Sequence, residues 1–317
     1  MRNKAFWSLV ILFLVCSSAL FAAPDPKFLT IGTAGSGGAY YPIGIAMADI
    51  ITNKVGIQTT AQITGGAIEN NSLINSRVVD LAISQGSTSF KAYQGLPPYK
   101  QKLTNVQGMI SGLSQGVFQL VVHKNSPIKS IKDIKGKKIS LGPAGGGAIT
   151  TFLEVISAYG YTEKDFQAVY TSYEQASDAL VDGNVDAIVV QAALPTPSIT
   201  QLTAAKKPVR FISIEEEALK RLMAKYAYFA KLTIPKEVYG TDEPVNTFYI
   251  ANIVVVSKSL STDLVYRITK AMFENLDTIH KSHPSVKGLT LETAVAGMPI
   301  PWHPGAAKYY KEKGLLK

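Results

Sequence analysis

The chain has 317 residues, of which 46% are hydrophobic and 17% charged, and its formal net charge at pH 7 is +9. This length and composition can build the packed cores of two domains, while a single cysteine, Cys16, excludes an internal disulfide framework. The main basic cluster, residues 124–138, has no interleaved aromatic side chain, so it fits a solvated surface and we expect no nucleic-acid partner.

Residues 1–23 have the pattern of a secretory signal peptide. A basic start with Arg2 and Lys4 precedes an apolar run at residues 5–15, and small residues follow. The run is shorter than the roughly 20 residues that span a bilayer. We therefore expect export to the periplasm and cleavage of the signal peptide. Lipid attachment at Cys16 is an open alternative, although a bulky residue precedes this cysteine.

The first predicted βα unit begins at residue 28, and a second unit repeats its plan. Residues 28–38, FLTIGTAGSGG, indicate a short strand and a glycine-rich turn, and the following residues place apolar side chains at helical spacing. Residues 138–147, KISLGPAGGG, show the same order and again precede an apolar helical pattern. The recurrence indicates two similar halves.

Each half also contains a helical segment that runs into a strand ending in glutamine. These strands are VDLAISQ at residues 79–85 and VDAIVVQ at residues 185–191. Strands that alternate with helices favour parallel-rich sheets with helices on both faces. We therefore predict an α/β protein with two lobes.

Two longer apolar segments bracket the second half of the pattern. Residues 117–123 and 247–257 are continuous β-type runs, and we predict that they form the two crossings between the lobes. Lobe one would then comprise residues 28–116 and 247–317, and lobe two would comprise residues 117–246.

The glycine-rich turns predict an anion-binding cleft. A helix N-terminus after such a turn offers unpaired N–H groups and a partial positive charge of about half a unit, so it binds an anion without a basic side chain. These turns lie at the carboxyl ends of strands, where ligands bind in open α/β sheets, and residues 64–67, TGGA, add a third glycine pair. Helix packing alone would explain one such turn, but not its recurrence. Nearby amide and hydroxyl side chains suit a carboxylate.

Several motifs resemble catalytic or cofactor sites but lack a required part. Residues 142–150, GPAGGGAIT, have the frame of a phosphate loop without its Lys and Ser or Thr. Ser114 lies in a G-x-S-x-G sequence, yet a strand follows it rather than a helix. His280 and His283 lack a third ligand at useful spacing, and the acidic run at residues 215–217 fits a solvated helix face. We expect no catalytic residue, metal or cofactor.

A series of segments, taken in chain order, resembles one family of transport receptors. They are IGTAGSGGAYYPIG, ITGGAIEN, RVVDLAISQ, IKDIKGKKISLGPAGGGA, DGNVDAIVVQAALPTP, LVYRITKAMFENL and MPIPWHPGAAKYY. Together they closely resemble the TAXI family, the TRAP-associated extracytoplasmic solute receptors, over essentially the whole chain after the signal peptide. The resemblance implies a type II periplasmic-binding-protein fold, with two lobes, a hinge and an interlobe ligand cleft.

The same resemblance implies a function and a set of contacts. The ligand would be glutamate, 2-oxoglutarate or a related dicarboxylate, and the partner a membrane-embedded TRAP permease driven by an ion gradient. The implied ligand contacts are Ser36, Gly37, Gly38, Tyr40, Gly66, Ala67, Asn70, Gln85, Gly145, Gly146, Gly147, Ala148 and Gln191. Ala67 stands where relatives often have serine, which leaves the ligand itself open. These loops contain no arginine, unlike those of the other TRAP receptor family.

Two alternative functions stay open. A receptor of an ATP-driven importer for another small anion would share the fold but use a different permease. A sensory binding module that takes no part in transport is the other alternative. We expect a monomer without enzymatic activity.

Overall fold

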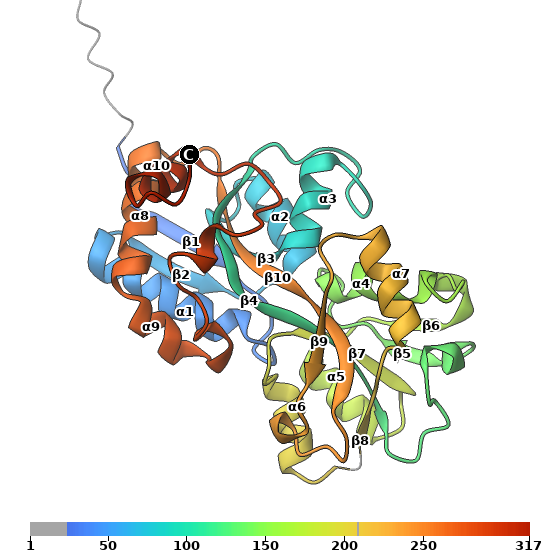
Figure 1. Cartoon of the computed structure of the whole chain (residues 1–317). Helices are drawn as coiled ribbons and strands as arrows, with labels where there is room; N and C mark the ends of the chain where they lie inside the picture. Colours follow the sequence, from blue (N-terminus) through green and yellow to red (C-terminus); the bar gives the residue numbers. More distant parts are fainter. Residues whose placement is uncertain (1–23, 208) are drawn as a thin grey trace, which may run out of the picture.

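The computed structural model describes residues 24–207 and 209–317 and has two lobes joined by two long strands (Figure 1). The predicted signal peptide and Cys16 lie outside these residues. One lobe, which we call lobe one, contains α1–α3 and α8–α10, and the other, lobe two, contains α4–α7. Within the described ranges, no helix has the length and apolar character needed to cross a membrane.

The two joining strands are β4 (Val106–His123) and β10 (Val245–Ser257), which pair with each other in antiparallel orientation. At one end, β10 pairs with β3 in lobe one, and at the other end β4 pairs with β7 in lobe two. One ten-stranded sheet results, with the order β2-β1-β3-β10-β4-β7-β5-β6, while β8 adds to β4 and β9 to β10. Hydrogen bonding is therefore continuous from one lobe to the other.

The strand predicted at residues 117–123 begins earlier than expected. β4 already starts at Val106, and its first part contains Gly108, Gly112 and Gly116, which hide the strand pattern. A Cβ on Gly108 would lie 2.4 Å from the Met298 sulfur, so the Met298 side chain of the C-terminal segment packs in the space that the glycine leaves open. The lobe boundaries at residues 117 and 247 stay predictions.

Lobe one is built on β1, β2 and β3, which are parallel to one another. Their bounds are β1 Phe28–Gly32, β2 Gln58–Gln62 and β3 Leu81–Gln85. The helices of this lobe are α1 Tyr40–Ile50, α2 Ala67–Asn75, α3 Gly86–Gln94, α8 Thr262–Glu274, α9 Leu276–Ser282 and α10 Pro304–Glu312.

Lobe two repeats the parallel arrangement with β5, β6 and β7. Its strands are β5 Lys138–Ser140, β6 Gln167–Val169, β7 Ala187–Ala192, β8 Val209–Ile212 and β9 Ala230–Ile234. Its helices are α4 Gly147–Ser157, α5 Tyr173–Val181, α6 Pro197–Ala204 and α7 Glu216–Lys225.

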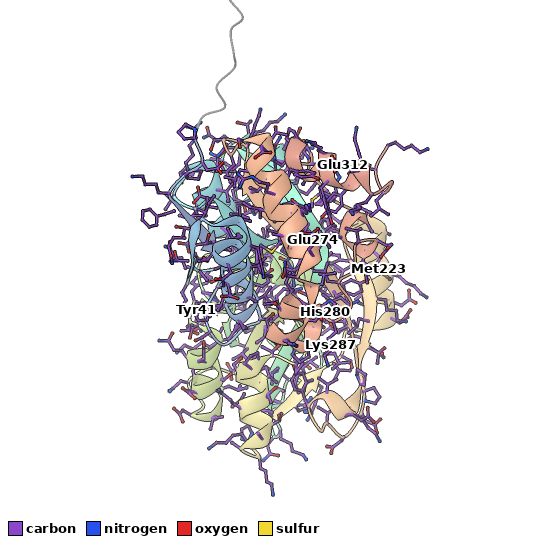
Figure 2. All side chains as sticks on the ribbon, turned by 90° about the vertical axis from the view of Figure 1, so that its left-hand side faces the viewer. Tyr41, Met223, Glu274, His280, Lys287 and Glu312 are labelled. Atoms are coloured by element: carbon purple, nitrogen blue, oxygen red, sulfur yellow. The ribbon has the colours of Figure 1, made fainter. Side chains whose placement is uncertain are left out.

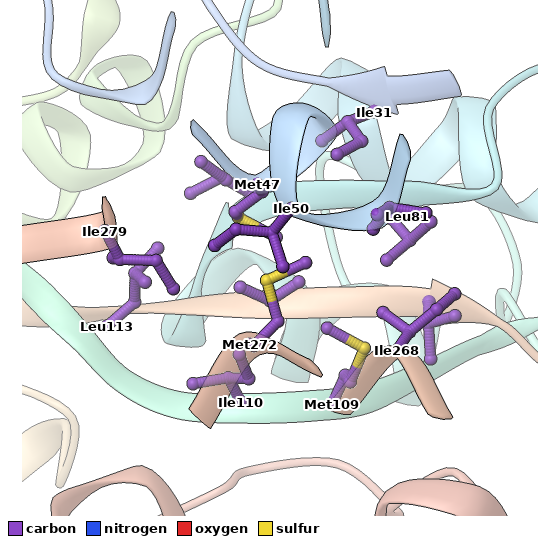
Figure 3. Packing of buried hydrophobic residues seen from close by; sticks show 14 of the residues in the cluster. Ile31, Met47, Ile50, Leu81, Met109, Ile110, Leu113, Ile268, Met272 and Ile279 are labelled. Atoms are coloured by element: carbon purple, nitrogen blue, oxygen red, sulfur yellow. The ribbon is translucent and has the colours of Figure 1, made fainter. Parts of the chain in front are cut away.

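Each lobe has its own hydrophobic core. In lobe one, Met47 of α1, Met272 of α8 and Ile110 of β4 pack in one fully buried cluster (Figure 3). In lobe two, Phe118 stacks on Phe248 with ring centroids 5.1 Å apart. Burying one such side chain contributes about 1.5–3 kcal/mol relative to leaving it exposed. These cores hold the strand ends, and the turns that follow them, in fixed positions.

Candidate functional site

A cavity of about 180 Å³ lies between the lobes. Lobe one lines it with the turn after β1, the loop before α2 and the end of β3, and lobe two with the turn after β5, the start of α5 and the end of β7. The volume suits a small solute, because clefts for drug-sized ligands measure roughly 300–1,000 Å³.

Most of the residues singled out from the sequence line this cavity. They are Gly37, Gly38, Tyr40, Gly66, Ala67, Gln85, Gly146, Gly147 and Gln191. These residues come from turns and strand ends spread over residues 37–191. The tertiary structure brings them together because each follows a strand of the same continuous sheet.

Four of the predicted contacts do not line the cavity and contribute to its construction instead. The Asn70 side chain is fully buried and donates hydrogen bonds of 2.7 Å to the main-chain oxygens of Thr33 and Ile83. Ser36 donates to the Glu174 carboxylate, at 2.8 Å. Ala148 is buried in the first turn of α4.

Gly145 is the fourth, and it closes the gap between the lobes. Its carbonyl oxygen accepts hydrogen bonds from the amides of Ile68 at 2.9 Å and Glu69 at 3.1 Å, both in the first turn of α2. A Cβ on Gly65 would lie 2.9 Å from both the Cα and the nitrogen of Gly145, so two backbones meet here. Only glycines permit this approach, and the lobes are closed on each other.

Helix N-termini converge on the cavity. The residues that precede α1, α2, α3, α4 and α5, which are Ala39, Gly66, Gln85, Gly146 and Ser172, all line it. Within residues 24–207 and 209–317, α1–α4 have no side-chain cap at these ends. The uncapped first turns of α1, α3 and α4 present N–H donors and positive dipole ends, whereas α2 already donates two first-turn amides to the Gly145 oxygen. The cavity is therefore suited to an anion, although no basic side chain of the described residues lines it.

Two glutamines offer buried hydrogen-bonding atoms at the ends of β3 and β7. Gln85 is 1% exposed, and neither Oε1 nor Nε2 has a hydrogen-bond partner among the described residues. Gln191 donates through Nε2 to the Gly116 carbonyl oxygen, while its Oε1 has no partner in the same part of the chain. Buried polar groups are normally paired, so these atoms point to a ligand that pairs with them.

An ion pair joins the lobes between α3 and α4. Lys91 of α3 contacts the Glu154 carboxylate of α4, and the two side chains are only 13% and 9% exposed. The Tyr228 hydroxyl donates a second hydrogen bond to the same Glu154 oxygen, at 2.6 Å. Because the pair is shielded from water, loss of either partner would leave an uncompensated charge when the lobes are closed.

Sequence reasoning did not include the start of α5 among the ligand contacts. Ser172, Tyr173 and Glu174 all line the cavity. The Tyr173 hydroxyl bonds to the main chain of Gln191, and burial raises the pKa of Tyr173 to about 12. The spacing of Ser172 and Gln175 is that of a capping box, which marks a helix start and could have located this segment.

The residues of the discounted catalytic motifs have structural partners. Ser114 lies in β4 and accepts a hydrogen bond from Asn252 Nδ2 at 2.9 Å. His280 lies in α9, on the side of lobe one seen in Figure 2, and its Nε2 is 2.8 Å from the Leu289 oxygen. His283 caps the short turn that follows it. Among the described residues, no group of His, Cys, Asp and Glu has the arrangement of a metal site.

Comparison with known proteins identifies the family of this chain and structures that share its fold. The sequence pattern of the NMT1-like family matches residues 31–314. The chain belongs to the NMT1-like family. A Haemophilus influenzae protein with the provisional name of thiamine biosynthesis protein is 35% identical to this NMT1-like chain over 114 residues, 35% of this chain and 32% of that protein. The chain thus spans about a third of this curated relative.

Solved structures share the fold of the NMT1-like chain at low sequence identity. PhnD1 from Prochlorococcus marinus, in complex with methylphosphonate, is 13% identical with a TM-score of 0.55, and the match covers 83% of this chain and 89% of that one. The alkanesulfonate-binding protein SsuA from Xanthomonas axonopodis pv. citri, bound to MOPS, is 15% identical with a TM-score of 0.50, covering 84% and 81%. The fold is the two-lobed type II fold of periplasmic solute-binding proteins, as the sequence predicted.

Proposed function

We propose that this NMT1-like protein is an exported receptor that binds a small carboxylate between its lobes and delivers it to a TRAP-type permease. Glutamate, 2-oxoglutarate and related dicarboxylates are the proposed solutes. The observation that carries the proposal is the convergence of the N-termini of α1–α5 on one interlobe cavity. Main-chain N–H groups there can bind a carboxylate, and each hydrogen bond to a charged group contributes about 1.5–3 kcal/mol.

Ligand binding would favour the closed arrangement. In an open receptor, the side chains of Gln85 and Gln191 would be exposed to water. Closure buries the Gln85 amide group and the Gln191 Oε1 atom, and these atoms have no hydrogen-bond partner among the described residues. Leaving such an atom unpaired costs about 1–3 kcal/mol. A ligand that pairs with these atoms removes this cost only in the closed state, which is the condition for a ligand to drive closure. The hinge would lie in β4 and β10, near Gly112 and Gly116.

A thermal-shift screen of amino acids and C4 to C6 dicarboxylates tests the ligand class. The protein is unfolded, washed free of bound solute and refolded before the screen. A solute present at 100 times its Kd stabilises a protein by about 2.7 kcal/mol, which for this size raises the Tm by roughly 5 °C or more. The matched control is Gln85→Met, which keeps the side-chain length but removes both hydrogen-bonding groups. The proposal fails if no carboxylate raises the Tm, or if the variant responds like the wild type.

Solute uptake by cells tests the permease. Uptake through a TRAP permease should stop when an uncoupler collapses the ion gradients while cellular ATP is maintained. Uptake that continues under these conditions and stops on ATP depletion would assign the receptor to an ATP-driven importer instead.

A further inference from the structure

Glu174 is the charged side chain that lines the cavity within residues 24–207 and 209–317. The other lining residues are glycines, apolar side chains, hydroxyl groups and the two glutamines. A small solute enclosed here therefore meets one formal charge from a side chain, and this charge is negative.

The Glu174 carboxylate reaches from lobe two to the first glycine turn of lobe one. Its Oε1 accepts the Ser36 hydroxyl at 2.8 Å, and a Cβ on Gly37 would lie 2.5 Å from its carboxyl carbon. Although burial raises the pKa of Glu174, hydrogen bonds from its own amide, Ser36, Ser172 and Gly37 outweigh burial and leave the pKa below its usual value. The group is ionised at neutral pH, and it takes the place at this turn that was expected for the carboxylate of the ligand.

Gln191 adds a second hydrogen-bond acceptor, and a contact with Gly116 determines which of its two side-chain amide atoms is the oxygen. Its Nε2 must face the Gly116 carbonyl oxygen, because a carbonyl oxygen cannot accept from the amide oxygen. Its Oε1 is then left as a buried acceptor without a partner among the described residues. Glu174 and Gln191 both come from lobe two; Glu174 contributes a negative charge that Ser36 and Gly37 already hydrogen-bond, whereas the Gln191 oxygen still requires a donor from the solute.

We propose that Glu174 determines specificity by requiring a positively charged group on the solute, so that the receptor takes α-amino acids in preference to the corresponding 2-oxo acids. This inference rests on the proposed carboxylate receptor and narrows its solute class. The uncapped N-termini of α3 and α4 are left for the carboxylate, while the ammonium group of the solute lies beside Glu174 and the Gln191 oxygen. A dicarboxylate without an amino group would add two negative charges beside Glu174, with no cationic side chain in the lining to offset them.

Matched pairs of L-amino acids and 2-oxo acids test this assignment. The pairs are alanine and pyruvate, leucine and 4-methyl-2-oxopentanoate, and glutamate and 2-oxoglutarate, titrated calorimetrically into the full chain purified from the periplasmic fraction. We expect the amino acid of at least one pair to bind about tenfold or more tightly than its oxo acid. In Glu174→Gln, which retains an acceptor for Ser36, this preference should fall by about tenfold. Glu163→Gln removes one charge from an exposed position of the same lobe and is the charge-matched control.

The outcomes separate the inference from the proposed function. If the oxo acid binds as tightly as its amino acid in every pair that binds, the carboxylate receptor stands and the role of Glu174 is overturned. An equal loss of affinity for both members of a pair in Glu174→Gln also overturns it, because Glu174 would then only hold the lobes together. If no member of any pair binds, the carboxylate proposal fails and the inference fails with it. A loss of preference in Glu174→Gln alone, with Glu163→Gln like the wild type, supports the inference.

Discussion

The two glycine-rich turns have similar sequences but different surroundings. Around Gly35, in the turn after β1, a Cβ would meet nothing within 4 Å, and the nearby Gly37 receives a flexible carboxylate from lobe two. The turn after β5 instead packs Gly145 against the backbone of Gly65 and Gly147 against the buried Gln85. The first turn therefore contacts a side chain that can move, whereas the second contacts a backbone that cannot. A repeated motif determines a local turn, but the opposing lobe determines what the turn does.

The largest effect should come from the place where two backbones meet. In Gly65→Ala, the new Cβ would lie 2.9 Å from Gly145, and neither backbone can yield cheaply. Overpacking of this kind costs about 1–3 kcal/mol, here only in the closed state, so solute affinity should fall roughly 10- to 100-fold. The control is Gly288→Ala, which lies outside the cavity lining and whose Cβ meets nothing within 4 Å. Titration calorimetry measures both variants, and equal affinities would contradict the close approach of the two backbones.

The ion pair should produce a smaller loss. Lys91→Met leaves the Glu154 carboxylate, only 9% exposed, without its cation when the lobes close. Because opening the cleft returns Glu154 to water, we expect weaker solute binding, by about tenfold, rather than unfolding. Adding Glu154→Gln to Lys91→Met should restore part of the affinity. A double variant no better than Lys91→Met would show that the pair does not stabilise closure.

Each lobe has a tyrosine whose hydroxyl group hydrogen-bonds within that lobe, so the same substitution can be compared in both. Tyr40 donates to Asn252 Oδ1 at 2.6 Å in lobe one, and Tyr173 bonds to the main chain of Gln191 in lobe two. Replacing either with Phe leaves buried polar atoms unpaired, at a cost of about 1 kcal/mol or more. We expect the Tm to fall by about 2–4 °C in each variant. Clearly unequal losses would show that the two lobes do not use the hydroxyl groups in the same way.

The smallest expected effect is a decrease in thermal stability at acidic pH. Burial lowers the pKa of His283 and of His303, both in lobe one, although main-chain hydrogen bonds oppose the shift. Each histidine binds its proton more readily after unfolding, so its contribution to stability is complete above the unfolded pKa of about 6.5 and is lost as the pH falls toward the folded pKa. The Tm should therefore decrease between pH 7.5 and pH 5.5.

The matched variant for this test is His303→Asn. Asparagine can still cap α10, where His303 accepts from the Gly305 amide at 3.1 Å, but it does not titrate. The decrease in Tm should be shallower in this variant, and hydrogen exchange at pH 5.5 should accelerate in α10 before it does in α4. Equal acceleration in both helices would place the acid sensitivity outside lobe one.

Local sequence was enough to predict the βα units and the fold. The strand, turn and helix at residues 28–50 depend on apolar periodicity and glycines that lie close together in the chain, and so do those at residues 138–157. Gln85 and Gln191 could be singled out because each ends a strand in a repeated pattern. Such features depend on neighbours within a few turns, which the sequence displays directly.

Only the tertiary structure decided which residues meet across the cleft. Ser36 and Glu174 are 138 positions apart, and Lys91 and Glu154 are 63 apart, so no local pattern connects them. The role of Asn70 as an internal support likewise depends on main-chain oxygens from two other segments. The early start of β4 escaped prediction because its glycines fit packing partners that lie more than 130 residues away in sequence. The chain encodes its turns locally, whereas closure of two lobes is a long-range contact that exists only in the folded state.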